Sequence, residues 1–279
     1  MKYKIVSDSS SNIFTWDAIP YATVPIKILS TKKEYVDNEQ LDVAQMVEDL
    51  KTVKGATKTA CPGTGEWIEA FDGAECVFAI TLTSNLSGCY NSACVARDQY
   101  MEENPGCKVY VIDSLSTGGE MQLIIEKLTE LILLGKEFEE IVTEIEEYKD
   151  TTRLLFSLQS LTNLARNGRV SPAVATIAGV LGIRVVGSAT EGVLDPTDKV
   201  RGEKRAIATL FANMKKLGYK GGKVRINHCF NIESASALSE KIFAEFPSAD
   251  VKIIPCTALC SFYAEEGGLI IGYEGAKKH

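Results

Sequence analysis

Short runs of β-forming residues alternate with longer stretches of helical period along most of the chain. The clearest early strands are "KIVSDS", "VFAITLT" and "KVYVIDS". The helical stretches each carry an apolar face, first Met121, Ile124, Ile125, Leu128 and Leu131, then Phe138, Ile141, Val142, Ile145 and Tyr148. This alternation predicts an α/β protein whose strands are mainly parallel.

The chain is long for a single compact core, which predicts two domains. It has 279 residues, and chains commonly divide beyond about 250–300 residues. A second set of elements begins near "RLLFSLQSLTNLARNGRVSP", so we place the boundary near residue 150, between domains 1–150 and 151–279. The stretch "ATEGVLDPTDKVRG" in the second domain is rich in turn-forming residues. Farther on, "KVRINH" and "VKIIP" flank a helix and "GGLIIGY" follows, which predicts a smaller mixed sheet.

The composition argues against nucleic-acid-binding, membrane and secreted proteins. A net charge of −7 disfavours a nucleic-acid surface, and no apolar run approaches the about 20 residues of a membrane span. The start, "MKYKIVSDSS", lacks the apolar segment of a signal peptide, so we expect a cytoplasmic protein. The eight cysteines form no Cys-x-x-Cys pair, which predicts free thiols. With only His228 and His279 as imidazoles, we expect no metal site.

Hydroxyl side chains collect where predicted strands end and helices begin. These positions are Ser7, Ser9 and Ser10 beside Asp8, then Thr83, Ser84 and Ser87, then Ser114, Ser116 and Thr117 beside Asp113. Thr57 and Thr59 precede "CPG" in a predicted loop that we expect to reach the same edge. Ligands of open α/β sheets bind at this edge, and hydroxyls beside a helix N-terminus form a weak anion site that fits a carboxylate or a phosphate. Each hydroxyl taken singly is also explained as a helix cap.

The motifs of the common nucleotide-binding and hydrolytic enzymes are missing. The sequence has no Gly-x-x-x-x-Gly-Lys-Ser/Thr and no Gly-x-Ser-x-Gly, and Gly63-Thr64-Gly65 lacks the remainder of a dinucleotide fingerprint. A catalytic Ser–His or Cys–His pair would have to use His228. A transferase or hydrolase that uses Cys61 or Cys89 at the strand ends remains an alternative to a binding protein, and a purely structural or partner-binding role is a weaker one.

Two basic groups stand out in the second half. Arg166 and Arg169 flank "NG" where a helix closes, and Lys199, Arg201, Lys204 and Arg205 cluster in "KVRGEKR". Helix-end electrostatics and solvent exposure explain both groups. The alternative is a docking patch for an acidic partner or a phosphate, a role that suits the planar fork of arginine.

The order of these segments resembles that of the DegV family of bacterial fatty-acid-binding proteins. The matching pieces are "VSDSSSNI", "KTACPG", "LTSNLSGCYNSA", "VIDSLSTGGEMQLII", "LARNGRVS" and "DKVRGEKRAI", in the family's order and spacing. "KTACPG" stands where the family has a Thr-Ser-Gln-Pro loop, and "LTSNLSGCYNSA" where it has a Ser-Ser-x-Leu-Ser-Gly-Thr-Tyr run. The likeness covers essentially the whole chain.

The resemblance implies a three-layer α/β/α first domain with a parallel sheet and a two-layer α/β second domain with a mixed sheet. A long-chain fatty acid would lie between them. Thr59 and Ser84 would then donate to its carboxyl group, Ser87 and Gly88 would shape the corner, and Arg169 and Arg201 would lie near the mouth. Ser9 and Ser114, at neighbouring strand ends, complete the expected ligand-binding set. Family members of this type present the fatty acid to a separate kinase, which implies a carrier without cofactor or chemistry of its own.

The sequence departs from the family pattern near the last strand. Family members place a His there, in a His-x-Gly-Pro-Gly run, whereas this chain has "TALCSFYAEEGGLIIGYE" with Phe262 or Tyr263 at that place. Glu265 and Glu266 follow, and carboxylates close to a fatty-acid carboxylate would repel it. A ligand without a free carboxylate, such as another lipid or apolar metabolite, is therefore the alternative.

Overall fold

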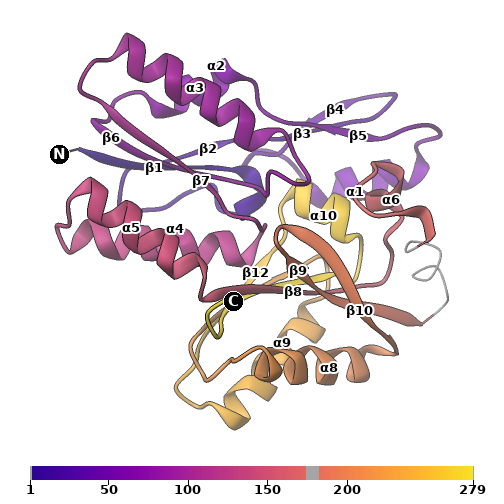
Figure 1. Ribbon diagram of the computed structural model, residues 1–279. Helices are drawn as coiled ribbons and strands as arrows, with labels where there is room; N and C mark the ends of the chain where they lie inside the picture. The colour runs from indigo at the N-terminus through magenta and orange to yellow at the C-terminus, as the bar shows by residue number, and fades with distance from the viewer. Residues whose placement is uncertain (1, 174–181, 279) are drawn as a thin grey trace.

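The computed structural model describes residues 2–173 and 182–278, whose strands form three sheets (Figure 1). The first is parallel, in the order β2-β1-β6-β7. Its strands are β1 (Tyr3–Asp8), β2 (Tyr21–Val24), β6 (Cys76–Thr81) and β7 (Lys108–Asp113). Helices α2 (Thr64–Phe71) and α3 (Cys89–Glu103) cover one face, and α4 (Gly119–Leu133) and α5 (Phe138–Lys149) cover the other. The predicted three-layer α/β/α arrangement is confirmed.

Both predicted apolar helix faces lie in the core between this sheet and helices α4 and α5. Met121, Ile124 and Leu128 are fully buried there with Ile141 and Ile145. Strand β6 is buried along its whole length, as a strand covered on both faces of a parallel sheet must be. The periodicity in the sequence therefore identified the residues that hold α4 and α5 against the sheet.

A small antiparallel sheet, in the order β4-β3-β5, lies at the edge of this first half. It consists of β3 (Lys27–Leu29), β4 (Glu34–Val36) and β5 (Lys58–Ala60), and α1 (Val43–Thr52) connects β4 to β5. The prediction that Thr59 lies in a loop is wrong. Thr59 pairs with Ile28 across β5 and β3, and a strand of only three residues has too few positions to show a period of two.

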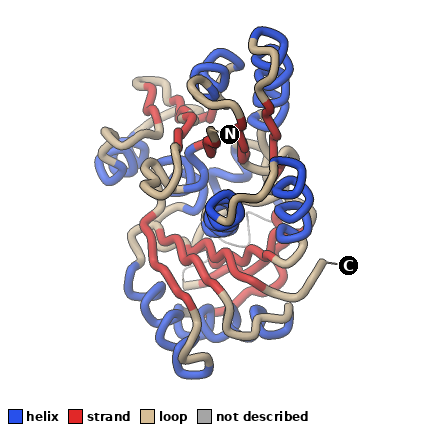
Figure 2. Tube along the Cα trace, turned by 90° about the vertical axis from the view of Figure 1, so that its left-hand side faces the viewer, coloured by secondary structure: helices blue, strands red, loops and turns tan. Residues whose placement is uncertain are grey.

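The second half forms a six-stranded mixed sheet in the order β10-β9-β8-β13-β11-β12. Its strands are β8 (Thr152–Leu158), β9 (Ile183–Thr190), β10 (Val193–Arg201), β11 (Lys223–His228), β12 (Asp250–Pro255) and β13 (Leu269–Glu274). β11 and β12 are parallel, and the other neighbours are antiparallel. Helices α8 (Glu203–Lys216) and α9 (Ile232–Glu245) cover one face, and the first half lies on the other (Figures 1 and 2). The predicted two-layer arrangement with a mixed sheet is confirmed.

The segment "ATEGVLDPTDKVRG", which is rich in turn-forming residues, is mostly strand. Only Glu191 and Gly192, both with positive φ, form the turn between β9 and β10. Pro196 lies within β10, which is an edge strand with a register shift between Pro196 and Asp198. A proline is tolerated at such a position because its missing N–H faces no partner strand. The tip of this hairpin meets the corner after β6, where Thr83 Oγ1 donates to the Gly192 carbonyl at 3.0 Å.

Helix α4 lies between the two larger sheets and packs against β13 and β11 as well as β1 and β6. Gly119 and Gly272 allow this approach, because a Cβ on Gly272 would overlap the backbone of Gly119 and Glu120. Two short helices, α6 (Thr162–Arg166) and α10 (Ala258–Ala264), complete the boundary between the halves. Within residues 2–173 and 182–278, no helix is both long and apolar enough to cross a membrane.

Gly272→Ala is expected to lower the free energy of unfolding by about 1–3 kcal/mol, since the added methyl group forces α4 and β13 apart. Urea denaturation followed by circular dichroism measures this change. Gly65→Ala is the matched control, because nothing lies within 4 Å of its new Cβ in α2. Alanine favours the helix there by about 0.5–1 kcal/mol, so equal losses in the two variants would contradict the close approach.

Candidate functional site

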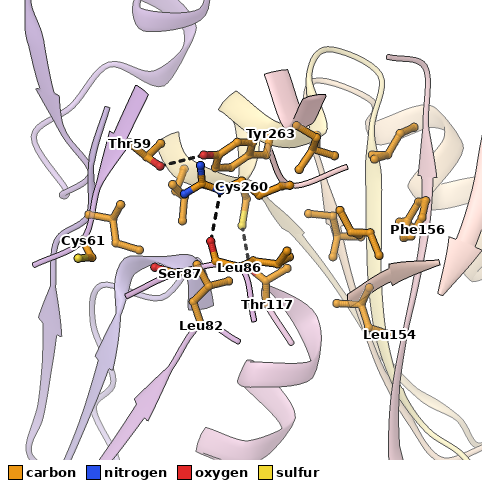
Figure 3. Close-up of a pocket in the computed structure, with 18 of the residues that line it drawn as sticks. Thr59, Cys61, Leu82, Leu86, Ser87, Thr117, Leu154, Phe156, Cys260 and Tyr263 are labelled. Carbon is orange, nitrogen blue, oxygen red and sulfur yellow. Dashed lines mark hydrogen bonds between the residues drawn. The ribbon is translucent and has the colours of Figure 1, made fainter. Parts of the chain in front are cut away.

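An apolar cavity of about 180 Å³ lies between the two halves of the chain (Figure 3). Most of its wall is aliphatic and includes Leu82, Leu86, Leu154, Leu158, Leu194 and Ile270. Leu154, Phe156 and Leu158 alternate along β8, so they share the face of the mixed sheet that is turned toward the first half. Leu155 points the other way, into the core under α8 and α9. The cavity is therefore walled by one face of the mixed sheet and by the strand ends of the first half.

Three polar side chains of the wall, those of Thr59, Tyr263 and Arg169, lie together at one end of the cavity. The hydroxyl of Thr117 lies in another part of the wall, 3.6 Å from the Cys260 sulfur (Figure 3). Thr59 Oγ1 and the Tyr263 hydroxyl lie 2.8 Å apart and share a hydrogen bond, and Arg169 lies beside them with its guanidinium carbon 5.9 Å from the Tyr263 ring centroid. Arg169 is the one charged side chain among the described residues of the wall. Burial raises the pKa of Tyr263, so its phenol stays protonated and can donate. Two hydroxyls and a cation form a site for an anionic or polar group.

Arg169 is held by backbone carbonyls. Its Nε donates to the Leu86 carbonyl at 3.2 Å, and its Nη1 donates to the carbonyl of Asn167. Leu86 belongs to the corner between β6 and α3, so the bond to its carbonyl joins the segment after α6 to the first half. Neither carbonyl carries a formal charge, and no carboxylate of the described residues forms an ion pair with this guanidinium.

Tyr263 is positioned by Asp37, a buried carboxylate that lies directly after β4. Asp37 accepts hydrogen bonds from the Ala258 amide at 2.8 Å, the Leu259 amide at 3.0 Å and the Thr257 hydroxyl at 3.2 Å. It therefore caps the free N–H groups at the start of α10. Tyr263, Leu259 and Cys260 of this helix line the cavity. A carboxylate next to the small sheet thus holds in place the helix that carries Tyr263, one of the residues at the polar end.

Four of the residues expected at the site line the cavity, namely Thr59, Ser87, Gly88 and Arg169. Ser87 caps the start of α3, since its Oγ accepts from the Cys89 amide at 3.3 Å. A side chain at Gly88 would press on the Cys61 sulfur, 3.2 Å from the new Cβ. Both residues shape the corner against which the polar end of the cavity lies.

Ser84, Ser9 and Ser114 do not line the cavity. Ser84 is exposed, and its amide donates to Asp113 at 3.1 Å. Ser9 is buried and its Oγ accepts from the Ile26 amide at 3.1 Å. The Ser114 hydroxyl donates to the Ser116 carbonyl at 3.1 Å. Ser114 thus has the turn role that strand-end hydroxyls commonly have, and Ser9 holds the segment between β2 and β3. The expected contact of Ser84 with a head group finds no support in this geometry.

Arg201 lies far from the cavity, contrary to its expected place near the mouth. It ends β10, an extended strand whose other end carries the wall residue Leu194. An extended chain rises about 3.3 Å per residue, which separates the two residues by about 20 Å. The basic cluster around Arg201 is thus a solvent-facing feature of the mixed sheet's edge.

The segment that replaces the family's histidine run contributes Tyr263, which the sequence left undecided between two aromatics. Phe262 points instead into a core with Ile28, Tyr35 and Met46. The expected repulsion from Glu265 and Glu266 is wrong, because neither lines the cavity. Glu265 accepts from the Asn163 amide at 3.0 Å, and Glu266 pairs with Lys51 at 2.8 Å.

The thiols and the imidazole do not form a nucleophile–base pair. Cys61 is exposed and lines the cavity, whereas Cys89 is buried and burial raises its pKa well above the ordinary value. A protonated thiol is a poor nucleophile. His228 is not among the described wall residues, and its Nδ1 accepts from the Asn231 amide at 3.2 Å. Within the described part of the chain, no group of three His, Cys, Asp or Glu residues is placed to hold a metal ion.

Solved structures of other proteins share this architecture. The Streptococcus pneumoniae Fatty Acid Kinase (Fak) B3 protein, loaded with linoleic acid, superposes with a TM-score of 0.97 at 41% sequence identity, covering 99% of this chain and 100% of that one. A DegV family protein from Eubacterium eligens, loaded with heptadecanoic acid, gives a TM-score of 0.96 at 43% identity, covering 98% of this chain and 100% of that one.

Sequence comparison leads to the same group of proteins. A DegV domain-containing protein of Streptococcus pneumoniae strain R6 is 42% identical over 282 residues, covering 98% of this chain and 99% of the relative. The model of the DegV family, described as one of uncharacterised proteins, matches residues 2–275. With nearly its whole length matched, this chain belongs to the DegV family.

Proposed function

We propose that this protein binds a long-chain fatty acid in the cavity between its two halves. The carboxyl group is held at the end formed by Thr59, Tyr263 and Arg169, and the acyl chain extends along the aliphatic wall toward Phe156. The observation that carries this proposal is the grouping of the wall's single described charge, on Arg169, with the hydroxyls of Thr59 and Tyr263 at one end. The fatty acids in the two structural relatives support it.

Apolar burial supplies most of the binding free energy in this proposal. Each buried methylene contributes about 0.8 kcal/mol, whereas the polar end fixes the direction in which the ligand lies. The cavity slightly exceeds the roughly 150 Å³ of a cavity that admits benzene. A long acyl chain has roughly three times as many carbons as benzene, so its entry must push the walls apart.

We further propose that the protein is a cytoplasmic carrier that needs no cofactor and presents the carboxyl group to a separate fatty-acid kinase. The name of the Streptococcus pneumoniae relative, a Fatty Acid Kinase B protein, supports such a partner. The protonated state of the buried Cys89 thiol and the position of His228 outside the described wall favour a carrier over a thiol-dependent transferase or hydrolase.

Mass spectrometry of lipid extracted from the purified protein tests this function. We expect a long-chain fatty acid, and a rise in melting temperature when hexadecanoic acid is added to lipid-free protein. Hexadecanoic acid should bind at least tenfold more tightly than its methyl ester, because the ester leaves Arg169 without a charged partner. Equal binding of acid and ester would favour a ligand without a free carboxylate.

Tyr263→Phe is expected to raise the dissociation constant for hexadecanoic acid about tenfold or more. The variant removes one hydrogen bond to a charged group, which contributes about 1.5–3 kcal/mol. Competition with a fluorescent fatty acid measures the change. Tyr273→Phe is the control, since its buried hydroxyl lies in the core under α8 and has no hydrogen-bond partner among the described residues. An unchanged dissociation constant for Tyr263→Phe would remove Tyr263 from the head-group site.

A further inference from the structure

Phe156 closes the apolar end of the cavity. Its ring lies at the side away from Thr59 and Cys61 (Figure 3), and the side chain is only 1% exposed. Within the described wall, the other aromatic side chain is Tyr263 at the polar end. The remaining wall residues of the mixed sheet are aliphatic, among them Leu154, Leu158 and Ile270.

The ring of Phe156 fills a notch in the mixed sheet that a glycine creates. Phe156 pairs with Gly187 on β9 and with Ile270 on β13. A Cβ on Gly187 would lie 2.5 Å from the Phe156 Cζ atom and would also overlap the Asp195 carbonyl oxygen. The ring therefore lies against the bare backbone of β9, in space that no side chain of position 187 can occupy. Removing the ring opens this space to the cavity.

We propose that Phe156 determines the length of the acyl chain that the protein prefers. This inference rests on the proposed function. A chain anchored by its carboxyl group at Thr59, Tyr263 and Arg169 runs away from them along the aliphatic wall, and the Phe156 ring stands at the end of that path. A longer chain must displace the ring from its place over Gly187, whereas a shorter chain buries fewer methylene groups against the wall. Both changes weaken binding, so the position of this ring sets an optimum length.

The test is a binding series with straight-chain saturated fatty acids of 14, 16, 18 and 20 carbons on lipid-free protein. Phe156→Ala is expected to move the optimum to acids at least two carbons longer than the wild-type optimum. Each methylene that enters the vacated notch should tighten binding about fourfold, relative to the wild type, because its burial contributes about 0.8 kcal/mol. Leu155→Ala is the matched control on the same strand, since Leu155 is equally buried but faces the opposite core.

A Phe156→Ala variant that folds and keeps the wild-type optimum overturns the inference, as does a Leu155→Ala variant that shifts the optimum equally. If Phe156→Ala does not fold, Phe156→Leu replaces it, with a smaller shift in the same direction expected and an unchanged optimum again counting against Phe156. If the proposed function itself is wrong, the wild-type protein binds none of the acids, and this result differs from an unchanged optimum length.

Discussion

Replacing Arg225 by methionine is expected to lower the free energy of unfolding by about 3–5 kcal/mol, the usual loss when one partner of a buried ion pair is removed. Arg225 lies on β11 and is fully buried. Its guanidinium donates to Glu126 on α4 at 2.8 Å and 2.5 Å, and to Asp250 on β12 at 2.8 Å. Burial alone would raise the pKa of Glu126, but its bonds to Arg225 and Lys252 keep it below the ordinary value. Without Arg225, a largely buried carboxylate loses its closest cation.

Urea denaturation at pH 7 measures this loss, and Lys252→Met is the control. Lys252 also contacts Glu126, at 2.9 Å, but its side chain is 51% exposed, so we expect a loss below about 1 kcal/mol. Adding Glu126→Gln to the Arg225→Met variant should recover part of the stability, because it removes the unpaired charge. Similar losses for Arg225→Met and Lys252→Met would show that burial does not strengthen this contact.

The stability difference between Asp37→Asn and the wild type is expected to change by about 2 kcal/mol between pH 4 and pH 7, in favour of the variant at pH 7. Burial raises the pKa of Asp37 from 3.8 to about 6, against the opposing effect of its hydrogen bonds from Leu259 and Ala258. The folded state therefore holds this proton more tightly than the unfolded state does. The resulting stabilisation is present below about pH 4 and is lost as the pH rises through 6.

Denaturation of the Asp37→Asn variant and the wild type at pH 4, 5, 6 and 7 measures how the difference between their stabilities changes with pH. Asp8, whose pKa burial also raises to about 6, titrates in both proteins, so its contribution cancels. Asp49→Asn is the control of opposite sign, because hydrogen bonds from Gln45 and Tyr35 lower the pKa of that carboxylate. A difference between Asp37→Asn and the wild type that stays constant across this range would mean that Asp37 is ionised throughout.

Local pattern was enough to predict the α/β class and to show hydroxyls such as Ser87 at the strand ends. The expected places of Gly88 and Arg169 at the site come instead from the resemblance to the DegV family, and both residues line the cavity. Ser84 is expected there on both grounds, yet it is exposed, because a strand-end hydroxyl can turn toward solvent as readily as toward a ligand. A position at the end of a strand or helix is therefore not sufficient for this kind of site.

The acyl end of the site could not be predicted from the sequence. Along β8, alternation shows that Phe156 and Leu155 point to opposite sides, but it does not show which side meets the other half of the chain. That choice depends on α4 packing between the two sheets, and this packing depends on two glycines far apart in the chain, Gly119 and Gly272. Tyr263 depends likewise on Asp37, a carboxylate in another sheet. Contacts between distant segments therefore determine which face of β8 lines the cavity and where Tyr263 lies, and local periodicity does not show either.

The bond between Asp37 and α10 also bears on how the chain folds. The amides that Asp37 accepts from belong to Ala258 and Leu259, 221 and 222 residues farther along the chain. The Thr257 amide likewise donates to Asn12 at 2.8 Å. Contacts between such distant segments close long loops, which is slow compared with local helix formation. The cavity, which needs α10 for its wall, is accordingly expected to form after the local helices.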